Sequence, residues 1–341
     1  MNPMTDAFRM RRRSRMLARV ALIICAYGAA SHAAQPEAES TQGYPVKPVR
    51  IVVPFAPGGG TDTIARILAL KLTEALGQAV IVDNRPGAGG TIGADLVAKS
   101  AADGYTLLFG SPGPISVNPH LQANIPYQAL RDFAPVTQVS TSPLVLVLNQ
   151  SVPAGSVKEL IALARAQPGQ LNYGSAGNGA VEHLGAELFK FLTGVNLVHV
   201  PYKGTGPALT DLLGGQIQML FENMPPVLPH IKSGKLKALG VGAVKRSSFL
   251  PDTPTIIEAG VPGYEASSWF GILVPAATPR RVVGILNAAS VKLLQSRDVK
   301  DRLAAIGAEP VGNTPEEFGA YLKAKLVEIG RIVKAADMKM E

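Results

Sequence analysis

The chain has 341 residues, of which 47% are hydrophobic and 17% charged, and its formal net charge is +8. This length is enough for two domains with a sizeable core, and the composition is that of a globular protein. The 35 glycines and 27 prolines are spread along the chain. They indicate many turns between short elements and exclude a low-complexity sequence.

The first 33 residues are typical of a secretory signal peptide. Six arginines precede the short apolar run 20–27, and Ser31-His32-Ala33 places small residues before a cleavage point after Ala33. The run is far shorter than the roughly 18 residues of a membrane-spanning helix. Both the general secretory and the twin-arginine routes stay open. We therefore expect a signal peptide over 1–33, a linker over 34–44 and an exported mature protein.

The signal segment also carries most of the positive charge. Its six arginines and one aspartate give it a net +5, so the rest of the chain is only +3. A nucleic-acid partner is therefore not expected. The single cysteine, Cys25, lies in the same segment, which excludes disulfides and cysteine-ligated zinc from the mature chain.

The stretch 52–62, VVPFAPGGGTD, is the most informative part of the sequence. A strand over 51–53 stops at a proline, three glycines follow, and apolar residues at helical spacing predict a helix over 63–76. Thr61 and Asp62 are suited to be its N-cap. The free N–H groups and the positive dipole end of such a helix suit an anion. The alternative is a tight turn with no ligand.

The pattern of strand, glycine-rich turn and helix continues along the first part of the chain. Strands are predicted over 79–82 and 105–109, and the turns 84–90 and 110–113 follow them. This β-α-β-α-β order predicts a parallel, doubly wound sheet. Functional loops in such sheets lie beyond the carboxyl ends of the strands, where these turns occur.

A second α/β unit is expected between two extended apolar runs, 143–148 and 265–274. The elements predicted inside it are helices over 156–166, 180–192 and 207–213 and strands over 171–173, 197–200, 217–221 and 236–241.

The remaining chain is predicted to return to the first unit. Two helices are expected there, over 279–295 and 315–334, each preceded by a threonine cap. We therefore predict two doubly wound α/β domains joined by two crossing strands. Domain 1 comprises 45–142 plus 268–341 and domain 2 comprises 143–267, with hinges near Ser142 and Ser268.

The sequence lacks the main catalytic signatures. No Walker A motif is present, and Ser111 and Ser175 lie in turns that do not meet the G-x-S-x-G pattern. His183 and Glu187 share a helical face, but no third metal ligand is indicated. We expect no enzyme activity, no cofactor and no metal. A secreted α/β hydrolase that uses Ser111 or Ser175 remains an alternative.

The turns themselves offer hydrogen-bond donors. Two lie in the first unit, Ala56–Asp62 and Gly110–Ser111, and two in the second, Ser175–Gly179 and Thr205–Gly206. Facing turns from two domains would enclose a small anion in a cleft. Since neither side carries an acid–base pair, this arrangement favours a binding protein over an enzyme.

These stretches resemble the Bug family, the solute-binding receptors of tripartite tricarboxylate transporters. The resemblance covers nearly all of the mature chain, in the same order and spacing as the family pattern. The matching stretches are VVPFAPGGGTDTIAR (52–66), VDNRPGAGGTIGAD (82–95), DGYTLLFGS (103–111), LNYGSAGNGAVEHL (171–184), HVPYKGTGPALTDLLGGQIQMLFEN (199–223), HIKSGKLKALGV (230–241), PTIIEAGVPGYEASSWFGILVPAATP (254–279) and GAEPVGNTPEEF (307–318).

The resemblance implies a periplasmic, two-domain Venus-flytrap fold that holds a ligand carboxylate with backbone amides and water. Carried over to this chain, the first pincer is Phe55, Ala56, Gly58, Gly59, Thr61 and Asp62. The second pincer is Ser175, Ala176, Gly177, Asn178 and Gly179. Ser111, Thr205 and Asn223 are candidates for the distal group of the ligand. The sequence departs from the small polar residues of the family at Val181-Glu182.

The resemblance also implies a function. The expected ligand is a small carboxylate: a di- or tricarboxylate, an acidic amino acid, or a nicotinic-type or other aromatic acid. The expected partners are the membrane subunits of a tripartite tricarboxylate transporter, and we expect a monomer. A ligand-presenting sensor for a membrane kinase is a further alternative.

Overall fold

The structure is a computed structural model that describes residues 43–338. The predicted signal peptide, its cleavage point and nearly all of the predicted linker lie outside the described residues. Within them, no helix is both long enough and apolar enough to cross a membrane.

The described strands follow the order expected of an α/β protein. They are β1 (Val49–Val53), β2 (Val80–Asn84), β3 (Thr106–Gly110), β4 (Phe133–Asn149), β5 (Asn172–Ser175), β6 (Val198–Pro201), β7 (Met219–Asn223), β8 (Leu236–Val241), β9 (Ser267–Pro275) and β10 (Glu309–Pro310).

Helices alternate with these strands and close the chain. They are α2 (Gly60–Leu76), α3 (Thr91–Ala98), α4 (Asn118–Leu121), α5 (Ala129–Asp132), α6 (Val157–Ala166), α7 (Val181–Thr193), α8 (Thr205–Leu213), α9 (Met224–Lys232), α10 (Arg280–Gln295), α11 (Arg297–Ala305) and α12 (Pro315–Ala335), with a short 3₁₀ turn η1 (Ala88–Gly90) and a π turn η2 (Gly113–Val117).

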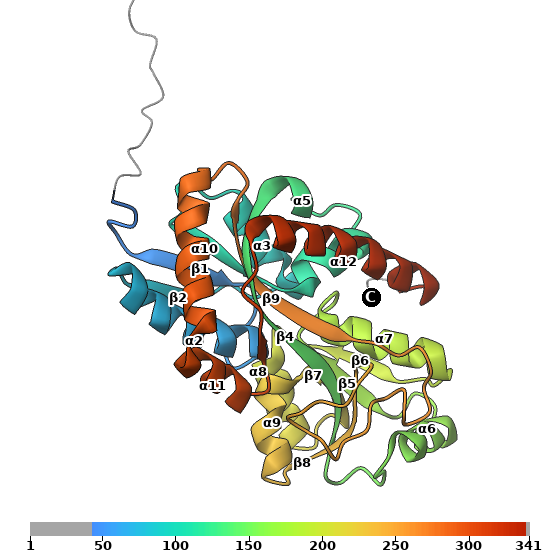
Figure 1. The fold of residues 1–341 in the computed structure, drawn as a ribbon. Helices are drawn as coiled ribbons and strands as arrows, with labels where there is room; N and C mark the ends of the chain where they lie inside the picture. Colours follow the sequence, from blue (N-terminus) through green and yellow to red (C-terminus); the bar gives the residue numbers. More distant parts are fainter. Residues whose placement is uncertain (1–42, 339–341) are drawn as a thin grey trace, which may run out of the picture. The chain divides into compact units, whose positions relative to one another are not determined.

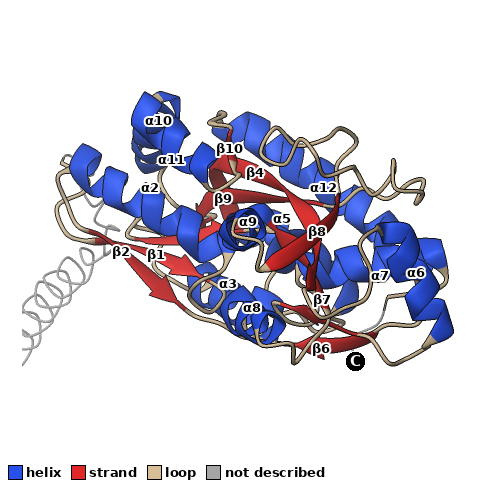
Figure 2. Ribbon diagram, turned by 90° about the horizontal axis from the view of Figure 1, so that it is seen from below, coloured by secondary structure: helices blue, strands red, loops and turns tan. Residues whose placement is uncertain are grey.

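The long strand β4 lies in the middle of the sheet between two antiparallel neighbours, β9 and β7, and a set of parallel strands lies beyond each of them (Figures 1 and 2). The order is β2-β1-β3-β9-β4-β7-β5-β6, and β8 and β10 also pair with β4. β1 is parallel to β2 and β3, and β5 is parallel to β6 and β7. β4 and β9 run antiparallel to each other. This topology confirms the predicted α/β class.

The two halves of β4 have different neighbours. The first half, 133–143, pairs with β9 and, at its end, with β10. The second half, 144–149, pairs with β7 and β8. We call β2, β1, β3, β9 and 133–143 the first strand group, and β6, β5, β7, β8 and 144–149 the second. Because hydrogen bonding continues along β4 from one group to the other, the domain limits stay a prediction.

Both faces of the first strand group are covered by helices. Ile64 and Leu68 of α2 and Val282 of α10 pack with the strands on one face. On the other face, α12 places Phe318 edge-on against Trp269 of β9, with ring centroids 5.5 Å apart. Burial of a large apolar side chain contributes roughly 1.5–3 kcal/mol, so this packing fixes the strand ends that carry the turns.

The second strand group is covered in the same way. Helices α6 and α7 contribute Leu160 and Phe189 to the core on one face. Helices α8 and α9 contribute Leu212 and Val227 to the core on the other face. Each turn after β5 and β7 therefore leads directly into a helix that is anchored in a core.

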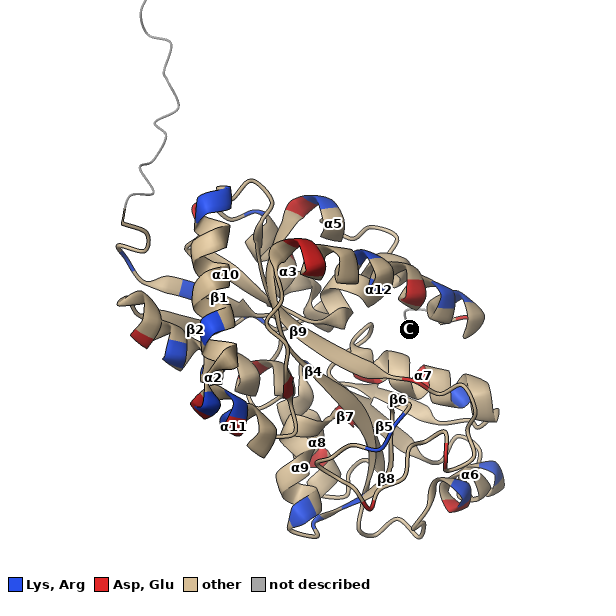
Figure 3. Ribbon diagram, in the orientation of Figure 1, with Lys and Arg blue, Asp and Glu red and all other residues tan. Residues whose placement is uncertain are grey.

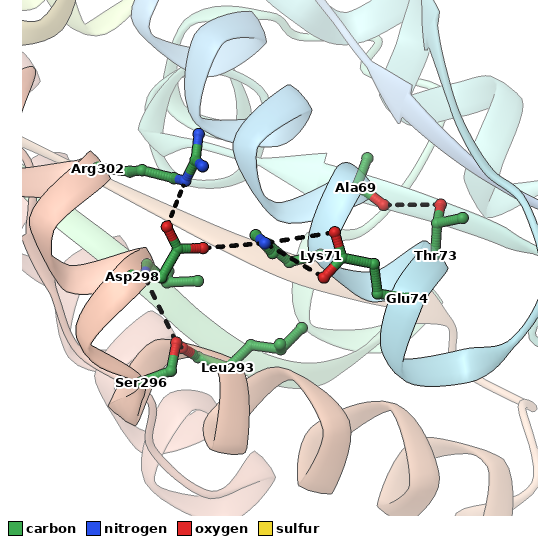
Figure 4. Close-up of polar contacts among 9 residues, drawn as sticks. Ala69, Lys71, Thr73, Glu74, Leu293, Ser296, Asp298 and Arg302 are labelled. Carbon is green, nitrogen blue, oxygen red and sulfur yellow. Dashed lines mark hydrogen bonds and ion pairs between the residues drawn. The ribbon is translucent and has the colours of Figure 1, made fainter.

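The surface charges are mixed in sign. Lys or Arg residues lie next to Asp or Glu along α6, α11 and α12 (Figure 3). Between α2 and α11, Lys71 Nζ lies 2.9 Å from an oxygen of Asp298, and Arg302 Nε lies 2.8 Å from the other oxygen (Figure 4). These pairs are exposed to solvent, so each contributes little to stability.

Several predicted boundaries were wrong. β4 extends from Phe133, because its first half alternates polar and apolar residues and lacks the continuous apolar run of 143–148. Helix α11 was missed, because only Val299 and Leu303 of its nine residues are buried. Thr314 caps α12 as predicted, but Thr278 does not cap α10, which has Pro279 in the N-cap position.

The N-terminus of α2 also differs from the prediction. The helix begins at Gly60 with Gly59 as the N-cap, so Thr61 and Asp62 lie inside the first turn. A glycine in this position has no side chain that can accept a hydrogen bond from the first turn.

Candidate ligand-binding site

A small cavity lies where the two strand groups meet. Its volume is about 10 Å³, and its lining residues come from the carboxyl ends of strands and the beginnings of helices. They are Phe55, Gly59, Thr61, Ser111, Ala176, Val181, Glu182, Thr205, Asn223 and Ser268. A volume of this size holds about one water molecule.

Four helices begin at this cavity. Gly59 and Thr61 belong to the start of α2, Glu182 to the first turn of α7, and Thr205 is the first residue of α8. Asn223 is the N-cap of α9. Each helix N-terminus carries a partial positive charge from its dipole, so the four together favour a negative charge in the cavity.

The N-cap residues of these four helices provide no side-chain cap. The N-cap positions are Gly59, Ala180, Gly204 and Asn223, and no side chain of theirs accepts a hydrogen bond from the first turn. The first N–H groups of a helix have no partner within the helix. At α9, Met224 N–H donates to Ser142 Oγ, and Pro225 and Pro226 carry no N–H. The backbone donors that suit an anion therefore lie at the starts of α2, α7 and α8.

Glycines allow the turns of the two strand groups to touch. Ala56 N–H donates to the carbonyl oxygen of Lys203 across the junction, with an N–O distance of 3.0 Å. At the second contact, a Cβ atom built on Gly89 would lie 2.1 Å from the carbonyl oxygen of Asn178. Any side chain at Gly89 would therefore force these two turns apart.

The structure brings half of the predicted site residues to the cavity. Those that line it are Phe55, Gly59, Thr61, Ser111, Ala176, Thr205 and Asn223. Those outside its lining are Ala56, Gly58, Asp62, Ser175, Gly177, Asn178 and Gly179. The ligand role of the whole set stays a prediction.

Some of the amides predicted for the two pincers already donate within the chain. Gly58 N–H donates to the carboxylate of Asp62 at 3.0 Å. Gly177 N–H donates to Ser175 Oγ, and Gly179 N–H donates to Nδ1 of His183. These bonds hold the shape of the turns, whereas the amides of the α2 start are free of side-chain caps.

Asp62 supports the first turn from inside. Its buried carboxylate accepts hydrogen bonds from Arg66 Nε at 3.0 Å and from Asn84 Nδ2 at 2.9 Å, in addition to Gly58 N–H. Burial works against ionisation, but these hydrogen bonds outweigh it and lower the pKa of Asp62. The carboxylate is thus charged and fully engaged in holding the glycine turn.

Glu182 lies in a different environment. It is 4% exposed and lines the cavity, and Glu222 behind it is fully buried. Asn223 Nδ2 donates to both carboxyl groups, at 2.7 Å to Glu182 and 3.1 Å to Glu222. Burial raises the pKa of Glu182 to about 7, and burial together with the nearby Glu182 raises the pKa of Glu222.

Ser175 forms a hydrogen bond with a histidine but lacks the rest of a catalytic triad. Its Oγ lies 2.7 Å from Nε2 of His199, whose Nδ1 has no partner among the described residues. Ser175 is fully buried and lies outside the cavity lining. A catalytic histidine needs a group that orients it, so this pair favours a structural role.

The histidines form part of a buried stack. The rings of His183 and His199 are parallel, with centroids 4.2 Å apart, and Tyr173 stacks on the other side of His199 at 4.8 Å. Burial lowers the pKa of His183 to about 4 and that of His199 to about 3. Both rings are therefore neutral near pH 7. Among residues 43–338, no cluster of metal-ligating side chains is present.

Sequence reasoning missed part of the cavity. Ser268 was expected only as a hinge, and Val181 and Glu182 only as a departure at the rim, but all three line the cavity. Asn223 Oδ1 and Ser268 Oγ are buried without a hydrogen-bond partner among the described residues. A glutamate in the first turn after a glycine-rich loop was the available signal for Glu182.

Comparison with known proteins identifies the family. The family model described as tripartite tricarboxylate transporter family receptor matches residues 64–338. The chain belongs to this family. Its members are periplasmic solute-binding receptors, a class of proteins that bind substrates without converting them. The predicted resemblance and the fold class are thereby confirmed.

Individual relatives are similar over nearly their full length. BugT of Bordetella pertussis is 41% identical, over 96% of this chain and 99% of its own. A Rhodopseudomonas palustris protein solved with adipate is 40% identical, with a TM-score of 0.85 over 87% of this chain and 99% of its own. MatC from the same species, solved with malate, is 34% identical, with a TM-score of 0.82 over 85% of this chain and 100% of its own.

Proposed function

We propose that this receptor captures a small carboxylate in the periplasm and delivers it to the membrane subunits of a tripartite tricarboxylate transporter. The observation that carries the proposal is the convergence on one cavity of three helix N-termini without side-chain caps, those of α2, α7 and α8. The adipate and malate bound by two related structures support a carboxylate as the ligand.

Backbone amides supply the attraction for the carboxylate. Among the described residues, the cavity lining contains no lysine or arginine. A carboxylate that leaves water loses strong hydration, and charge-assisted hydrogen bonds from N–H groups can offset this loss. The amides at the start of α2, around Gly59 and Thr61, are suited to this because the turn Phe55–Gly58 is held in place by Asp62.

Ligand entry requires the cavity to widen. A volume of about 10 Å³ is too small for a carboxylic acid with several carbon atoms. We propose that domain 1, 45–142 plus 268–341, and domain 2, 143–267, move apart about the crossing strands. Ser142 and Ser268 are paired where β4 passes from the first strand group to the second and β9 begins, which supports hinges at these positions.

A panel of organic acids tests the proposed function. A ligand that binds only the folded state stabilises it by about 2.7 kcal/mol at a hundredfold excess over Kd. One or more small carboxylates should therefore raise the melting temperature and show saturable heat in calorimetry. Absence of any response across mono-, di- and tricarboxylates would contradict the proposal.

The hydrolase alternative is tested in the same preparation. Turnover of an ester substrate that is lost in Ser175→Ala or Ser111→Ala would favour catalysis over binding. We expect no turnover, because His199 has no orienting partner at Nδ1 among the described residues.

Export and delivery complete the proposal. Mass spectrometry of the periplasmic protein should find an N-terminus near Ala34, following removal of residues 1–33. An intact N-terminus in the cytoplasm would refute the signal peptide. Uptake of the identified acid should require both this chain and the membrane subunits, and we expect the isolated receptor to be a monomer.

A further inference from the structure

The cavity has two chemically different ends. At the start of α2, around Gly59 and Thr61, it offers backbone N–H donors. At the starts of α7 and α9, it offers the carboxyl group of Glu182 and the amide group of Asn223. The first end suits a carboxylate, and the properties of the second end decide what the rest of the ligand can be.

Glu182 accepts the hydrogen bond of the Asn223 amide nitrogen, the donor that a second ligand carboxylate would need. The Asn223 amide nitrogen is the polar donor of this side chain. It already donates to Glu182 Oε1 at 2.7 Å and to Glu222 Oε1 at 3.1 Å. The two carboxyl groups show which end of the Asn223 amide faces them: it is the nitrogen, because a carboxylate accepts hydrogen bonds. What remains of the side chain for a ligand is an acceptor.

Unused acceptor capacity is present at this end. Asn223 Oδ1 is buried and has no hydrogen-bond partner among residues 43–338, and Asn223 is only 2% exposed. Ser268 Oγ on the same cavity is also buried and unpartnered, and a hydroxyl group can accept a hydrogen bond as well as donate one. A buried acceptor without a donor costs free energy, so a ligand that brings a donor relieves this cost.

We propose that Glu182 is a specificity-determining residue that excludes a second carboxylate and selects a ligand whose far end is a hydrogen-bond donor, an ammonium group in the simplest case. The inference rests on the proposed function, since it assigns the far end of the same carboxylate site. It separates this receptor from relatives whose structures hold the dicarboxylates adipate and malate.

The electrostatics of the carboxyl pair agree with this selection. Burial raises the pKa of Glu182, although hydrogen bonds from Asn223 and with Glu222 work against this, and burial together with the charge of Glu182 raises the pKa of Glu222. An ammonium group placed beside them would lower both pKa values, so its binding near pH 7 should release protons. A second carboxylate would raise the pKa values further and take protons up.

Matched ligand pairs test the proposal on the full mature receptor. Calorimetry should compare succinate with 3-aminopropanoate, glutarate with 4-aminobutanoate, and adipate with 5-aminopentanoate, since each pair differs by an ammonium in place of one carboxylate. In the pair of best-fitting length, we expect the amino acid to bind about tenfold more tightly or better, since like charges repel strongly in such sites. The heat measured in phosphate and in Tris should differ, because protons are released.

Two variants assign the effect to Glu182. Glu182→Gln should reduce the preference for the amino acid by about tenfold and abolish its proton release. Glu182→Ser frees the Asn223 N–H that donates to Glu182, while the other stays with Glu222, and it should increase the affinity for the matched dicarboxylate. The control is Glu187→Gln, one turn later on α7, because Glu187 bonds Tyr173 Oη and Lys190 away from the cavity. This control should keep the wild-type preference.

The outcomes separate the two proposals. If the wild type binds a dicarboxylate as tightly as its amino partner, the role of Glu182 is overturned and the proposed function stands. The same holds if Glu182→Gln and Glu182→Ser both keep the wild-type preference. If the wild type binds no carboxylate at all, the proposed function fails and this inference fails with it.

Discussion

Helix N-termini differ between the cavity and the surface of this protein. Ser156, Ser296 and Thr314 cap α6, α11 and α12, and each side chain accepts a hydrogen bond from the first turn of its helix. The four helices that begin at the cavity have no such bond. Helices α3 and α10 also lack one, so an absent cap alone does not mark the site. What marks the site is that several helix N-termini without a side-chain cap meet at one cavity.

The difference between the two kinds of helix N-terminus shows that a helix can lack the stability of a cap and keep its N–H groups for a ligand. A serine or threonine cap contributes about 1 kcal/mol to a helix because it satisfies an orphan N–H group. A capped N-terminus therefore has fewer donors for a ligand. At the cavity, Gly59, Ala180 and Gly204 leave these donors uncovered. The four predictions below test this comparison, from the largest expected effect to the smallest.

Gly59→Val should remove ligand binding. A Cβ atom built on Gly59 would lie 3.0 Å from Cβ and 3.1 Å from Oγ1 of Thr205 on the opposite side of the cavity. The φ angle of Gly59 is −84°, which any residue adopts, so the effect comes from lost space and not from backbone strain. The variant should lose the ligand-induced rise in melting temperature, about 2.7 kcal/mol at a hundredfold excess over Kd.

The matched control for this change is Gly284→Ala. Gly284 lies in α10, and a Cβ atom built on it would meet nothing within 4 Å. This variant should keep the full ligand response, measured by thermal shift with and without the acid. A full response in Gly59→Val as well would show that the start of α2 is not the carboxylate site.

Asp62→Asn should destabilise the fold by about 2 kcal/mol, because hydrogen bonds to a charged group contribute roughly 1.5–3 kcal/mol. The amide would present an N–H₂ group to Gly58 N–H, Arg66 or Asn84, which are all donors. Since the pKa of Asp62 is lowered in the folded state, its contribution is present above the usual pKa of 3.8 and is lost as pH falls through the folded value.

Denaturant unfolding at several pH values checks this prediction. The difference between wild type and Asp62→Asn should be largest near pH 7 and should shrink below pH 3.8. A difference that does not change with pH would mean that the charge of Asp62 contributes nothing. The expected loss is larger than that of an N-cap, because Asp62 supports the turn from inside α2.

The fold could be predicted well from the sequence, for local reasons. The glycine turn before α2 and the apolar spacing of that helix are encoded within about twenty residues, and so is the capping box of Thr314. The length of β4 was missed because its polar residues Thr137 and Gln138 are accommodated by Asn313, far away in sequence. Helix α11 was missed because only two of its nine residues are buried.

The site was predictable only in part, because its chemistry depends on long-range contacts. Asp62 and Glu182 are both acidic residues in the first turn of a helix that follows a glycine-rich loop. Arg66 and Asn84 lower the pKa of the first, whereas complete burial raises the pKa of the second, which lies beside Glu222. No local pattern distinguishes the two environments, since Glu222 is 40 residues away from Glu182.

Glu182→Gln should stabilise the unliganded protein near pH 7 by more than about 1.4 kcal/mol, the value of one pKa unit. Because the pKa of Glu182 is raised from 4.5 to about 7 in the folded state, stability is fully present below pH 4.5 and is lost as pH rises through 7. The glutamine amide cannot ionise, so the variant does not lose stability as pH rises. Its advantage should therefore disappear near pH 4.5.

Two histidines work in the opposite direction and must be separated from this effect. His183 and His199 have lowered pKa values, about 4 and about 3, so they destabilise the fold as pH falls below 6.5. Both wild type and Glu182→Gln contain them, and the difference between the two proteins cancels their contribution. An equal difference at pH 4.5 and pH 7.5 would contradict the raised pKa of Glu182.

The smallest expected effect is at a helix start away from the cavity. Thr314 Oγ1 accepts a hydrogen bond from Glu317 N–H, and the Glu317 carboxylate accepts one from Thr314 N–H. Thr314→Val keeps the shape of the side chain but removes the cap, so it should cost about 1 kcal/mol of stability. Ligand binding should not change, because Thr314 lies outside the cavity lining.

Thr278→Val is the matched control for this substitution. Thr278 was expected to cap α10, but its Oγ1 is buried and has no hydrogen-bond partner among the described residues. Loss of an unpartnered hydroxyl group in favour of an apolar group of the same shape should be neutral or stabilising. Chemical denaturation of both variants decides the point. Equal losses in both would mean that the cap of Thr314 contributes nothing specific, and the contrast between capped and uncapped helix starts would lose its energetic basis.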